Sequence, residues 1–432
     1  MKTTNRKFYL ALVIFSLVGQ IAWVMENMYF NVFIYKMFNA SAEAISSMVS
    51  ASAIAATVTT LLVGAFSDKI GKRKLFISGG YLCWGVSILS FAAIRTDVIS
   101  ALFPAAASAA SVGVSLVIIM DCVMTFFGSS ANDACFNAWV TDSTEENQRG
   151  AVEGINSMMP LLAILVVFGG FMGFDLNLQS SWTAVFLIVG AVVFLLGLLG
   201  FFLIEEKKMD TRGNEHYFSN LIYGFRPSVI AGNKPLYMTL LAYGVFGIAI
   251  NIFMPYLILY YTVSLQMDNY VLIFAPAIII AAAFTFFYGK VYDRRGFRGS
   301  VLLPIGMLMT GFVILYFFRS TPVVFVGTLV MLCGYLSGMA VFGAMLRDHT
   351  PEKKAGMFQG QRIIGQVLIP GVIGPAIGAA VLKNAETVLN DDGTTSFIPN
   401  ENIFLAAFMA AVCILIVLIP LFRMLKKENA HA

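Results

Sequence analysis

The chain has 432 residues, of which 59% are hydrophobic and only 12% are charged. An average soluble domain carries about 25% charged residues, so this composition excludes an ordinary soluble protein and favours a membrane protein. The net charge of +4 concerns orientation in the membrane and contact with anionic lipid, and it gives no argument for a nucleic-acid partner.

Apolar runs of about 20 residues recur along the chain, and each could cross a hydrocarbon core of roughly 30 Å as a helix. Because a backbone in lipid must satisfy its own hydrogen bonds, we predict an all-α membrane protein with twelve transmembrane helices. The predicted spans are residues 8–36, 43–66, 75–94, 107–138, 151–173, 182–204, 236–265, 270–290, 300–318, 322–346, 361–382 and 402–422. The first is expected to be a span rather than a cleaved signal, because it is too long and has no small-residue cleavage site.

The first span has one polar face. At 100° per residue, a single stripe contains Ser16, Gln20, Trp23, Asn27 and Asn31, with Glu26 at its edge. A stripe of this kind is unfavourable against lipid, so we expect it to face a central cavity and to bind a solute or a coupling cation.

A charged turn follows the second span and is repeated after the eighth. Self-alignment of GAFSDKIGKRK with GKVYDRRGFR pairs equivalent positions in the two halves. The residues are Gly64, Asp68, Gly71 and Arg73 in the first half, and Gly289, Asp293, Arg294, Gly296 and Arg298 in the second. A basic turn can also be a plain cytoplasmic anchor, and this alternative stays open.

The fourth span has a second polar face. An arc of roughly 120° contains Asp121, Thr125, Gly128, Ser129, Asn132, Asp133 and Phe136. Two carboxyl groups with hydroxyl and amide groups beside them suit a polar solute, a cation or a proton. The alternative is hydrogen bonding between helices, since polar residues also join membrane helices.

A second repeat follows the fourth and tenth spans, where the pattern that begins at Asp142 returns at Asp348. The two repeats have different offsets, so the first half must carry extra sequence between Arg73 and Asp142. We expect a longer outer loop or longer helices near residues 97–111. The chain then divides into a six-helix bundle at 1–204, a cytoplasmic linker at 205–235 and a second six-helix bundle at 236–432.

The second half offers fewer charged groups inside its spans. Its main candidates for completing a solute site are Tyr243, Asn251, Arg362 and Gln366. Arg362 could instead reach cytoplasmic water from the boundary of its span. Aromatic faces for a sugar ring could come from Trp23, Tyr29 and Trp139, although such residues also pack and anchor membrane helices.

The repeated G-x-x-x-D-[RK]-x-G-x-R turns, the twelve spans and the central linker resemble the major facilitator superfamily over essentially the whole chain. The resemblance implies two pseudo-symmetric six-helix bundles that move substrate by alternating access. It also implies that Asp68 and Asp293 help to hold the cytoplasmic side closed.

The segment NDACFNAWVTDSTEENQRG (132–150) is similar to the fourth-helix end of the glycoside-pentoside-hexuronide cation symporters. On that resemblance Asp133 corresponds to an acid used for cation and sugar binding, and Glu26 lies near the sugar-binding acid of helix one. The departure is in helix two, where residues 50–66 lack the pair of acids that sodium-coupled members carry. Proton coupling through Asp133, Glu26 or Asp121 is therefore favoured over sodium, with facilitated diffusion next.

These observations predict a secondary transporter for a small polar solute, with a sugar or glycoside as one candidate. The alternative is an exporter or a carrier of an amphipathic, lipid-like or drug-like substrate. No nucleophile–base pair, metal cluster or phosphate-binding loop occurs in the sequence, so we expect no enzyme, no metal and no cofactor. The excess of Lys and Arg in one set of loops predicts that both termini are cytoplasmic. We further expect a monomer in a bacterial inner membrane.

Overall fold

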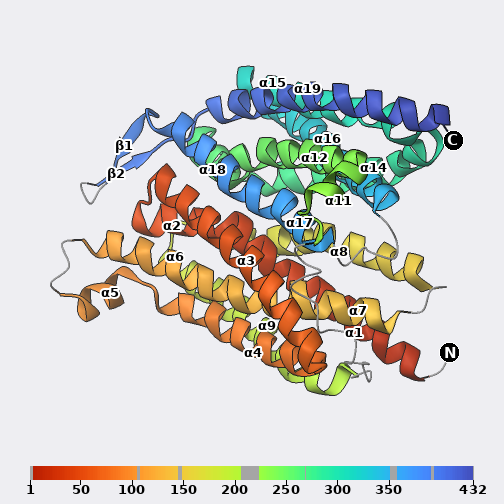
Figure 1. The fold of residues 1–432 in the computed structure, drawn as a ribbon. Helices are drawn as coiled ribbons and strands as arrows, with labels where there is room; N and C mark the ends of the chain where they lie inside the picture. The colour runs from red at the N-terminus through yellow and green to blue at the C-terminus, as the bar shows by residue number, and fades with distance from the viewer. Residues whose placement is uncertain are drawn as a thin grey trace. The chain divides into compact units, whose positions relative to one another are not determined.

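The computed structural model describes residues 3–104, 108–144, 148–205, 223–267, 269–350, 358–390 and 394–431. Helices account for nearly all of the regular structure in these ranges (Figure 1). The chain divides into two compact units, Met1–Tyr217 and Phe218–Ala432. The linker expected at 205–235 is described at Glu205 and from residue 223 onward.

The first unit contains six apolar helical rods, of which the first and fourth are interrupted. Its elements are α1 (Thr3–Val24), η1 (Met25–Tyr29), α2 (Phe30–Phe38), α3 (Ala42–Ile70), α4 (Arg73–Ser90), η2 (Phe91–Ala93), α5 (Thr96–Leu102), α6 (Ala109–Gly128), η3 (Ser129–Phe136), α7 (Asn137–Ser143), α8 (Arg149–Phe171) and α9 (Gln179–Leu203).

The second unit has six further rods and one small hairpin. Its elements are α11 (Pro227–Gly232), α12 (Lys234–Phe253), η6 (Met254–Tyr256), α13 (Leu257–Leu259), η7 (Tyr260–Ser264), α14 (Val271–Ser300), α15 (Leu302–Phe317), α16 (Thr321–His349), α17 (Gln359–Ile363), η9 (Ile364–Leu368), α18 (Ile369–Leu382), β1 (Thr387–Leu389), β2 (Thr395–Phe397) and α19 (Asn402–His431).

The helices match the predicted spans. Within the described ranges, ten helices are long and apolar enough to cross a membrane. Two shorter apolar helices, Ile155–Phe171 and Leu302–Phe317, stand where the fifth and ninth spans were predicted. Large apolar side chains such as Phe202 and Phe286 are exposed, as expected for surfaces that contact lipid rather than water. The all-α membrane class is therefore confirmed.

Four of the rods contain a π-helical turn. These turns are η1 in the first rod, η3 in the fourth, η7 in the seventh and η9 in the eleventh. A π-turn adds a residue to the local repeat, so it changes which side chains share a face, and such turns are frequent at functional sites. Glu26 lies in η1, Asp133 in η3 and Gln366 in η9.

Close helix packing in the first unit depends on small residues. A Cβ added at Gly85 would approach the backbone nitrogen of Phe194 to 2.5 Å, and one at Gly197 would approach that of Leu82 to 2.6 Å. These glycines bring α4 and α9 into contact, which is the usual role of small residues between membrane helices.

The connections between rods also bear on the sequence predictions. Residues 94–108, which include α5, join the third and fourth rods, whereas residues 318–320 make the equivalent connection in the second unit. The longer connection expected near residues 97–111 is present. The antiparallel hairpin β1–β2, with Val388 opposite Ser396, was not predicted.

Candidate functional site

Glu26 lies at the centre of a buried cluster formed by three rods of the first unit. Its Oε1 atom accepts hydrogen bonds from Ser52 Oγ of α3 and, at 2.8 Å, from Thr125 Oγ1 of α6. The two hydroxyl oxygens are themselves 2.8 Å apart. Glu26 is 6% exposed, and neither hydroxyl residue is more than 9% exposed. The three oxygen atoms therefore form a closed triangle shielded from solvent.

Asp121 lies beside this triangle and is only 1% exposed. The carboxyl group of Glu26 and the hydroxyl group of Ser52 are close enough to interact with Asp121 electrostatically. Glu26 Oε2 and Asp121 Oδ1 are both buried without a hydrogen-bond partner. Buried polar atoms of native proteins are usually paired, so these two oxygens require an explanation.

Asp133 occupies a different environment further along the fourth rod, eight residues beyond Thr125. Ser129 Oγ donates to its Oδ2 at 3.1 Å, and Asn132 Nδ2 donates to its Oδ1 at 3.2 Å. The indole of Trp23 lies close enough to interact with the Asp133 carboxyl group electrostatically. Asp133 is partly exposed rather than buried, so it can contact a solute directly.

Aromatic residues border the Asp133 cluster. The hydroxyl group of Tyr81 donates a hydrogen bond to Asn132 Oδ1, at an oxygen–oxygen distance of 2.9 Å. The rings of Trp23 and Trp84 are 5.1 Å apart between centroids. Gly128 leaves room for both indoles, because a Cβ there would come within 2.7 Å of Trp84 and 3.0 Å of Trp23. Tyr81 and Trp84 are fully buried and Asn132 is 4% exposed, so the half-buried Asp133 and Trp23 are the groups of this cluster that can contact a solute.

The other polar residues of the first rod bond within their own helix. Asn27 donates to the carbonyl oxygen of Trp23 at 2.8 Å, and Asn31 donates to that of Asn27 at 3.0 Å. Asn27 is exposed, while Asn31 is fully buried. They satisfy the backbone around η1 and do not join either carboxyl cluster through a side-chain hydrogen bond among the described residues.

The predicted residues of the second unit are spread along two rods. Tyr243 stacks on Phe342 with centroids 5.4 Å apart, and Tyr335 and Arg362 lie close enough to interact with its hydroxyl group electrostatically. Asn251 donates to the carbonyl oxygen of Gly247 in its own helix. Gln366 Nε2, in η9, is buried without a hydrogen-bond partner. Tyr243 and Arg362 are therefore neighbours, and Asn251 is satisfied by its own helix.

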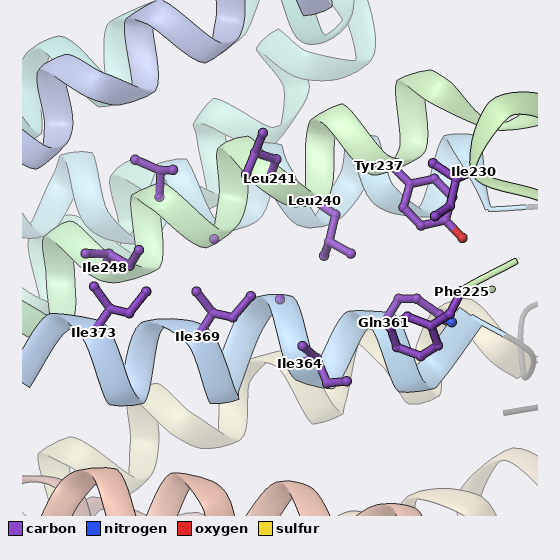
Figure 2. Close-up of a pocket in the computed structure, with 13 residues that line it drawn as sticks. Phe225, Ile230, Tyr237, Leu240, Leu241, Ile248, Gln361, Ile364, Ile369 and Ile373 are labelled. Carbon is purple, nitrogen blue, oxygen red and sulfur yellow. The ribbon is translucent and has the colours of Figure 1, made fainter. Parts of the chain in front are cut away.

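An apolar pocket of about 430 Å³ lies in the second unit between α12 and the rod formed by α17, η9 and α18. Figure 2 shows Leu240 and Ile248 on one wall and Ile364, Ile369 and Ile373 on the other. Tyr237 and Gln361 stand at one end, and they are the only lining residues with polar side chains. This pocket suits a hydrocarbon group.

The charged turn of the first unit binds the second repeated motif. Gly71 ends α3 with a φ of 70°, a conformation that glycine adopts at little cost. Arg73 is buried, and its Nε donates to Asp142 Oδ2 at 2.7 Å. Its guanidinium also donates to Ser67 Oγ at 3.3 Å. The side chain of Asp68 lies outside the described part of the structure, and Gly64 lies within α3.

The equivalent turn of the second unit makes the same connection differently. Gly296 has a φ of 64° and interrupts α14, at the position that corresponds to Gly71. Tyr292 donates to Asp348, the counterpart of Asp142. Arg298 is exposed and lies 5.7 Å from the ring of Phe422. The remaining motif residues are Gly289, Asp293 and Arg294, and the latter two are exposed.

Two expected aromatic faces are instead packed. Tyr29 is fully buried against Phe168 and Phe171, and Trp139 is 4% exposed and donates to the carbonyl oxygen of Glu205. Sequence reasoning missed Ser52 and Tyr81. Both are polar side chains inside predicted spans, which was an available signal, but several hydroxyl residues share the span of Ser52.

Comparisons with known proteins identify the family of this chain and structures with a similar fold. A family profile described as Major Facilitator Superfamily matches residues 9–375. A mutant form of the nucleoside transporter NupG has a TM-score of 0.72 at 12% identity, covering 96% of this chain and all of that one. A bacterial homologue of the human lysosomal transporter Spinster has a TM-score of 0.69 at 14% identity, covering 98% and 96% of the two chains. The xylose transporter XylE from E. coli, in its inward-open conformation, has a TM-score of 0.68 at 13% identity, covering 96% of each. A search of curated proteins found no match.

Proposed function

The chain belongs to the Major Facilitator Superfamily, and from this premise we propose a secondary active transporter that moves a small polar solute by alternating access. The family and the structural matches indicate a multi-pass membrane transporter rather than an enzyme. The observation that carries the proposal is the set of three carboxyl groups inside the spans of the first unit, Glu26, Asp121 and Asp133. Ionisable groups in a membrane span cost several kcal/mol and are usually retained for transport.

Proton coupling is the form of energy input that we propose. Among the described residues, no ion pair links Lys, Arg or His to any of these three carboxyl groups. A carboxyl group without a cationic partner in a low-dielectric site favours its neutral form, so it can take up and release a proton. The interior of α3 contributes hydroxyl groups and no acid between Glu43 and Asp68, which argues against a sodium site of the two-acid kind.

The solute is proposed to be neutral and polar, with a ring or other apolar side. Asp133 and Trp23, which are both half-buried, supply the carboxyl group and the ring face that such a solute requires. Two of the matched structures are those of a nucleoside transporter and a xylose transporter. A sugar or glycoside, which the resemblance to the glycoside-pentoside-hexuronide symporters implies, remains the narrower candidate.

The first experiment identifies the solute and its driving force. Purified protein is heated with a panel that includes a nucleoside, a pentose and a β-glycoside, since a ligand of the native state raises the unfolding temperature by mass action. The stabilising solute is then supplied to proteoliposomes with an imposed proton gradient or an imposed sodium gradient. Proton-driven accumulation is expected. Accumulation driven by sodium alone would contradict proton coupling, and counterflow without accumulation would indicate facilitated diffusion.

The proposed topology has both termini on the cytoplasmic side of a bacterial inner membrane, with a monomer as the transporting species. Cysteines introduced one at a time at 210–214 and at 391–394 test this in a cysteine-free background. The first segment and most of the second lie outside the described residues. Label should reach 210–214 only from the cytoplasm and 391–394 only from outside. Labelling of both segments from one side would contradict the twelve-span topology.

A carrier of an amphipathic substrate is the second candidate, and the apolar pocket of the second unit favours it. Leu240 and Ile364 face each other across this pocket (Figure 2). If a hydrocarbon group binds there, Leu240→Gln should abolish stabilisation by an alkyl glycoside but not by the free sugar. Equal stabilisation of the variant by both would remove the pocket from the substrate site.

A further inference from the structure

The Glu26 triangle has more oxygen–oxygen contacts than hydroxyl protons. Ser52 Oγ, Thr125 Oγ1 and Glu26 Oε1 make three mutual contacts. A serine and a threonine hydroxyl each carry a single proton, and an ionised carboxylate carries none. With Glu26 ionised, two protons serve three contacts, and one pair of oxygens faces each other without a proton between them.

One added proton completes the triangle. If Glu26 carries a proton on Oε1, each of the three oxygens donates one hydrogen bond and accepts one around the ring. Hydroxyl hydrogens can rotate to either partner, so both hydroxyl groups can donate to the Glu26 carboxylate when the proton leaves. The triangle is thus fully bonded in one protonation state and short of one proton in the other.

Among the described residues, the groups that face Glu26 add negative charge and no positive charge. They are Asp121 and Cys122 of α6 and Asp133 of η3, together with the hydroxyl groups of Ser52 and Thr125. Two carboxyl groups that share a buried site cannot both ionise without a large cost. The buried atoms Glu26 Oε2 and Asp121 Oδ1, which have no partner, are the free positions of this pair.

We propose that Glu26, held by Ser52 and Thr125 and backed by Asp121, is the group that binds and releases the coupling proton. This rests on the proposed function and narrows it, because sequence reasoning placed Asp133 first. Loading forms one O–H bond between a carboxylate oxygen and a proton from hydronium, leaving water. Release breaks that bond to water on the other side, and the electron pair stays on the carboxylate oxygen. Ser52 and Thr125 are positioning residues.

Infrared difference spectroscopy of the purified full chain tests the assignment with the proton as the only ligand. Spectra recorded across a pH titration report the C=O stretch of carboxylic acids that gain or lose a proton. The wild type should show such a band, Glu26→Gln should remove a component of it, and Asp133→Asn should retain that component. A band unchanged by Glu26→Gln would overturn the proposal.

Variants at Ser52 separate the proton site from packing. Ser52→Ala should displace the pH midpoint of the Glu26 component toward higher pH by about one unit, because the carboxylate loses a charge-assisted donor. Ser52→Thr keeps a hydroxyl and should restore the wild-type midpoint. An unchanged midpoint in Ser52→Ala would overturn the role given to the triangle.

The two proposals can fail separately. The spectra read protonation without any solute, whereas the proposed function is read from accumulation in proteoliposomes. Proton-driven accumulation that persists in Glu26→Gln would contradict this inference and leave the transport function standing. A titrating Glu26 in a chain that accumulates none of the tested solutes would support the inference and count against the proposed function.

Discussion

Glu26 and Asp133 are acidic residues of the same unit with different hydrogen-bond donors. Glu26 is bonded only to hydroxyl groups, which can donate or accept. Asp133 accepts from one hydroxyl group, that of Ser129, and from the amide nitrogen of Asn132, which can only donate, and it lies near the indole of Trp23. Fixed donors hold a carboxylate in place for a solute, whereas reversible donors accommodate a proton. The two acids therefore suit different tasks.

Asp133→Asn tests the solute half of this division. An amide keeps the shape of the side chain but removes the charge that strengthens its hydrogen bonds, which are worth about 1.5–3 kcal/mol each. We expect solute affinity to fall by about tenfold or more, measured as the ligand concentration that raises the unfolding temperature. Asn137→Asp would add a charge beside the site, so it is not a useful control. Thr141→Val, one turn beyond Asn137, is a suitable control. Unchanged affinity in Asp133→Asn would remove Asp133 from the solute site.

The sequence pattern singles out some residues of the site but not others. Asp121 and Thr125 stand out because polar groups four residues apart in an apolar span share a face. Ser52 does not stand out, because hydroxyl residues in spans often bond their own backbone, as Thr57 does to Ala53. Its role depends on the approach of α3 to α6, which no local pattern records.

The site depends on how closely the helix α4 approaches the π-turn η3. A Cβ added at Gly80 would lie 2.7 Å from the Cβ of Ala131, which is less than a carbon–carbon contact allows. Gly79, its neighbour in the same helix, has no atom within 4 Å of its added Cβ. The two adjacent glycines therefore differ in function: Gly80 permits the packing that positions Asn132 and Tyr81, and Gly79 does not.

Gly80→Ala and Gly79→Ala form a matched pair. Gly80→Ala should lower the free energy of unfolding by about 1–3 kcal/mol, the usual cost of forcing an extra carbon into a packed site. Gly79→Ala should leave stability unchanged or raise it slightly, because alanine is the better helix former. The check is thermal unfolding in detergent. Equal effects in the two variants would contradict the packing described here.

The buried pair Arg73–Asp142 joins the start of α4 to the end of α7. The side chain of Arg73 is 8% exposed and that of Asp142 is 34% exposed. Removing one partner of a largely buried pair weakens the compensation of the other charge, at a cost of up to about 3 kcal/mol. We expect Arg73→Gln and Asp142→Asn each to lower the unfolding temperature, with less than additive loss in the double variant.

An exposed ion pair provides the control for that cycle. Arg95 and Asp97 lie in the connection around α5 and are both exposed, and the guanidinium of Arg95 lowers the pKa of Asp97. Arg95→Gln should change stability far less, because water screens exposed charges. A strictly additive Arg73–Asp142 cycle would mean that the pair contributes nothing of its own.

Elements were predictable where their signal is local. Twelve apolar runs of spanning length identify the rods, because hydrocarbon requires helices of that length. The π-turns η1 and η3 were not predicted, since a single added residue leaves no mark in composition. An uninterrupted spacing of 100° per residue therefore placed Asn27 and Trp23 in one stripe. In the structure the Asn27 side chain bonds a backbone carbonyl, whereas the Trp23 side chain lies near Asp133.

Each of the two units connects its two repeated motifs, but the side chains that make the connection differ. The aspartate at the end of the fourth rod, Asp142, binds Arg73, and its counterpart Asp348 binds Tyr292. Self-alignment predicted that these motifs are equivalent but not that they touch each other, because contact between distant segments is a property of the fold. The glycines at the two turns, Gly71 and Gly296, share a positive φ.

Asp68 and Asp293 are the residues that the family resemblance assigns to closing the cytoplasmic side. The charged turn is tied to its own unit through Arg73 or Tyr292, so an aspartate on it is held by a fixed frame. If these aspartates stabilise the closed state, Asp68→Asn should slow solute exchange and increase the population of the inward-open state. Asp293→Asn should do the same to a smaller degree, because its turn contains an exposed arginine, Arg298, in place of a buried one.

The measurement combines counterflow rates with labelling of a cysteine placed on the cytoplasmic half of α16. Faster labelling from the cytoplasm together with slower counterflow is the expected result. Solute affinity should not change, because the turns lie outside both carboxyl clusters. Arg95→Gln is the control, since it alters an exposed charge in the connection around α5. If both aspartate variants transport and label like the wild type, these turns act only as membrane anchors, because their charge then makes no difference between the two states.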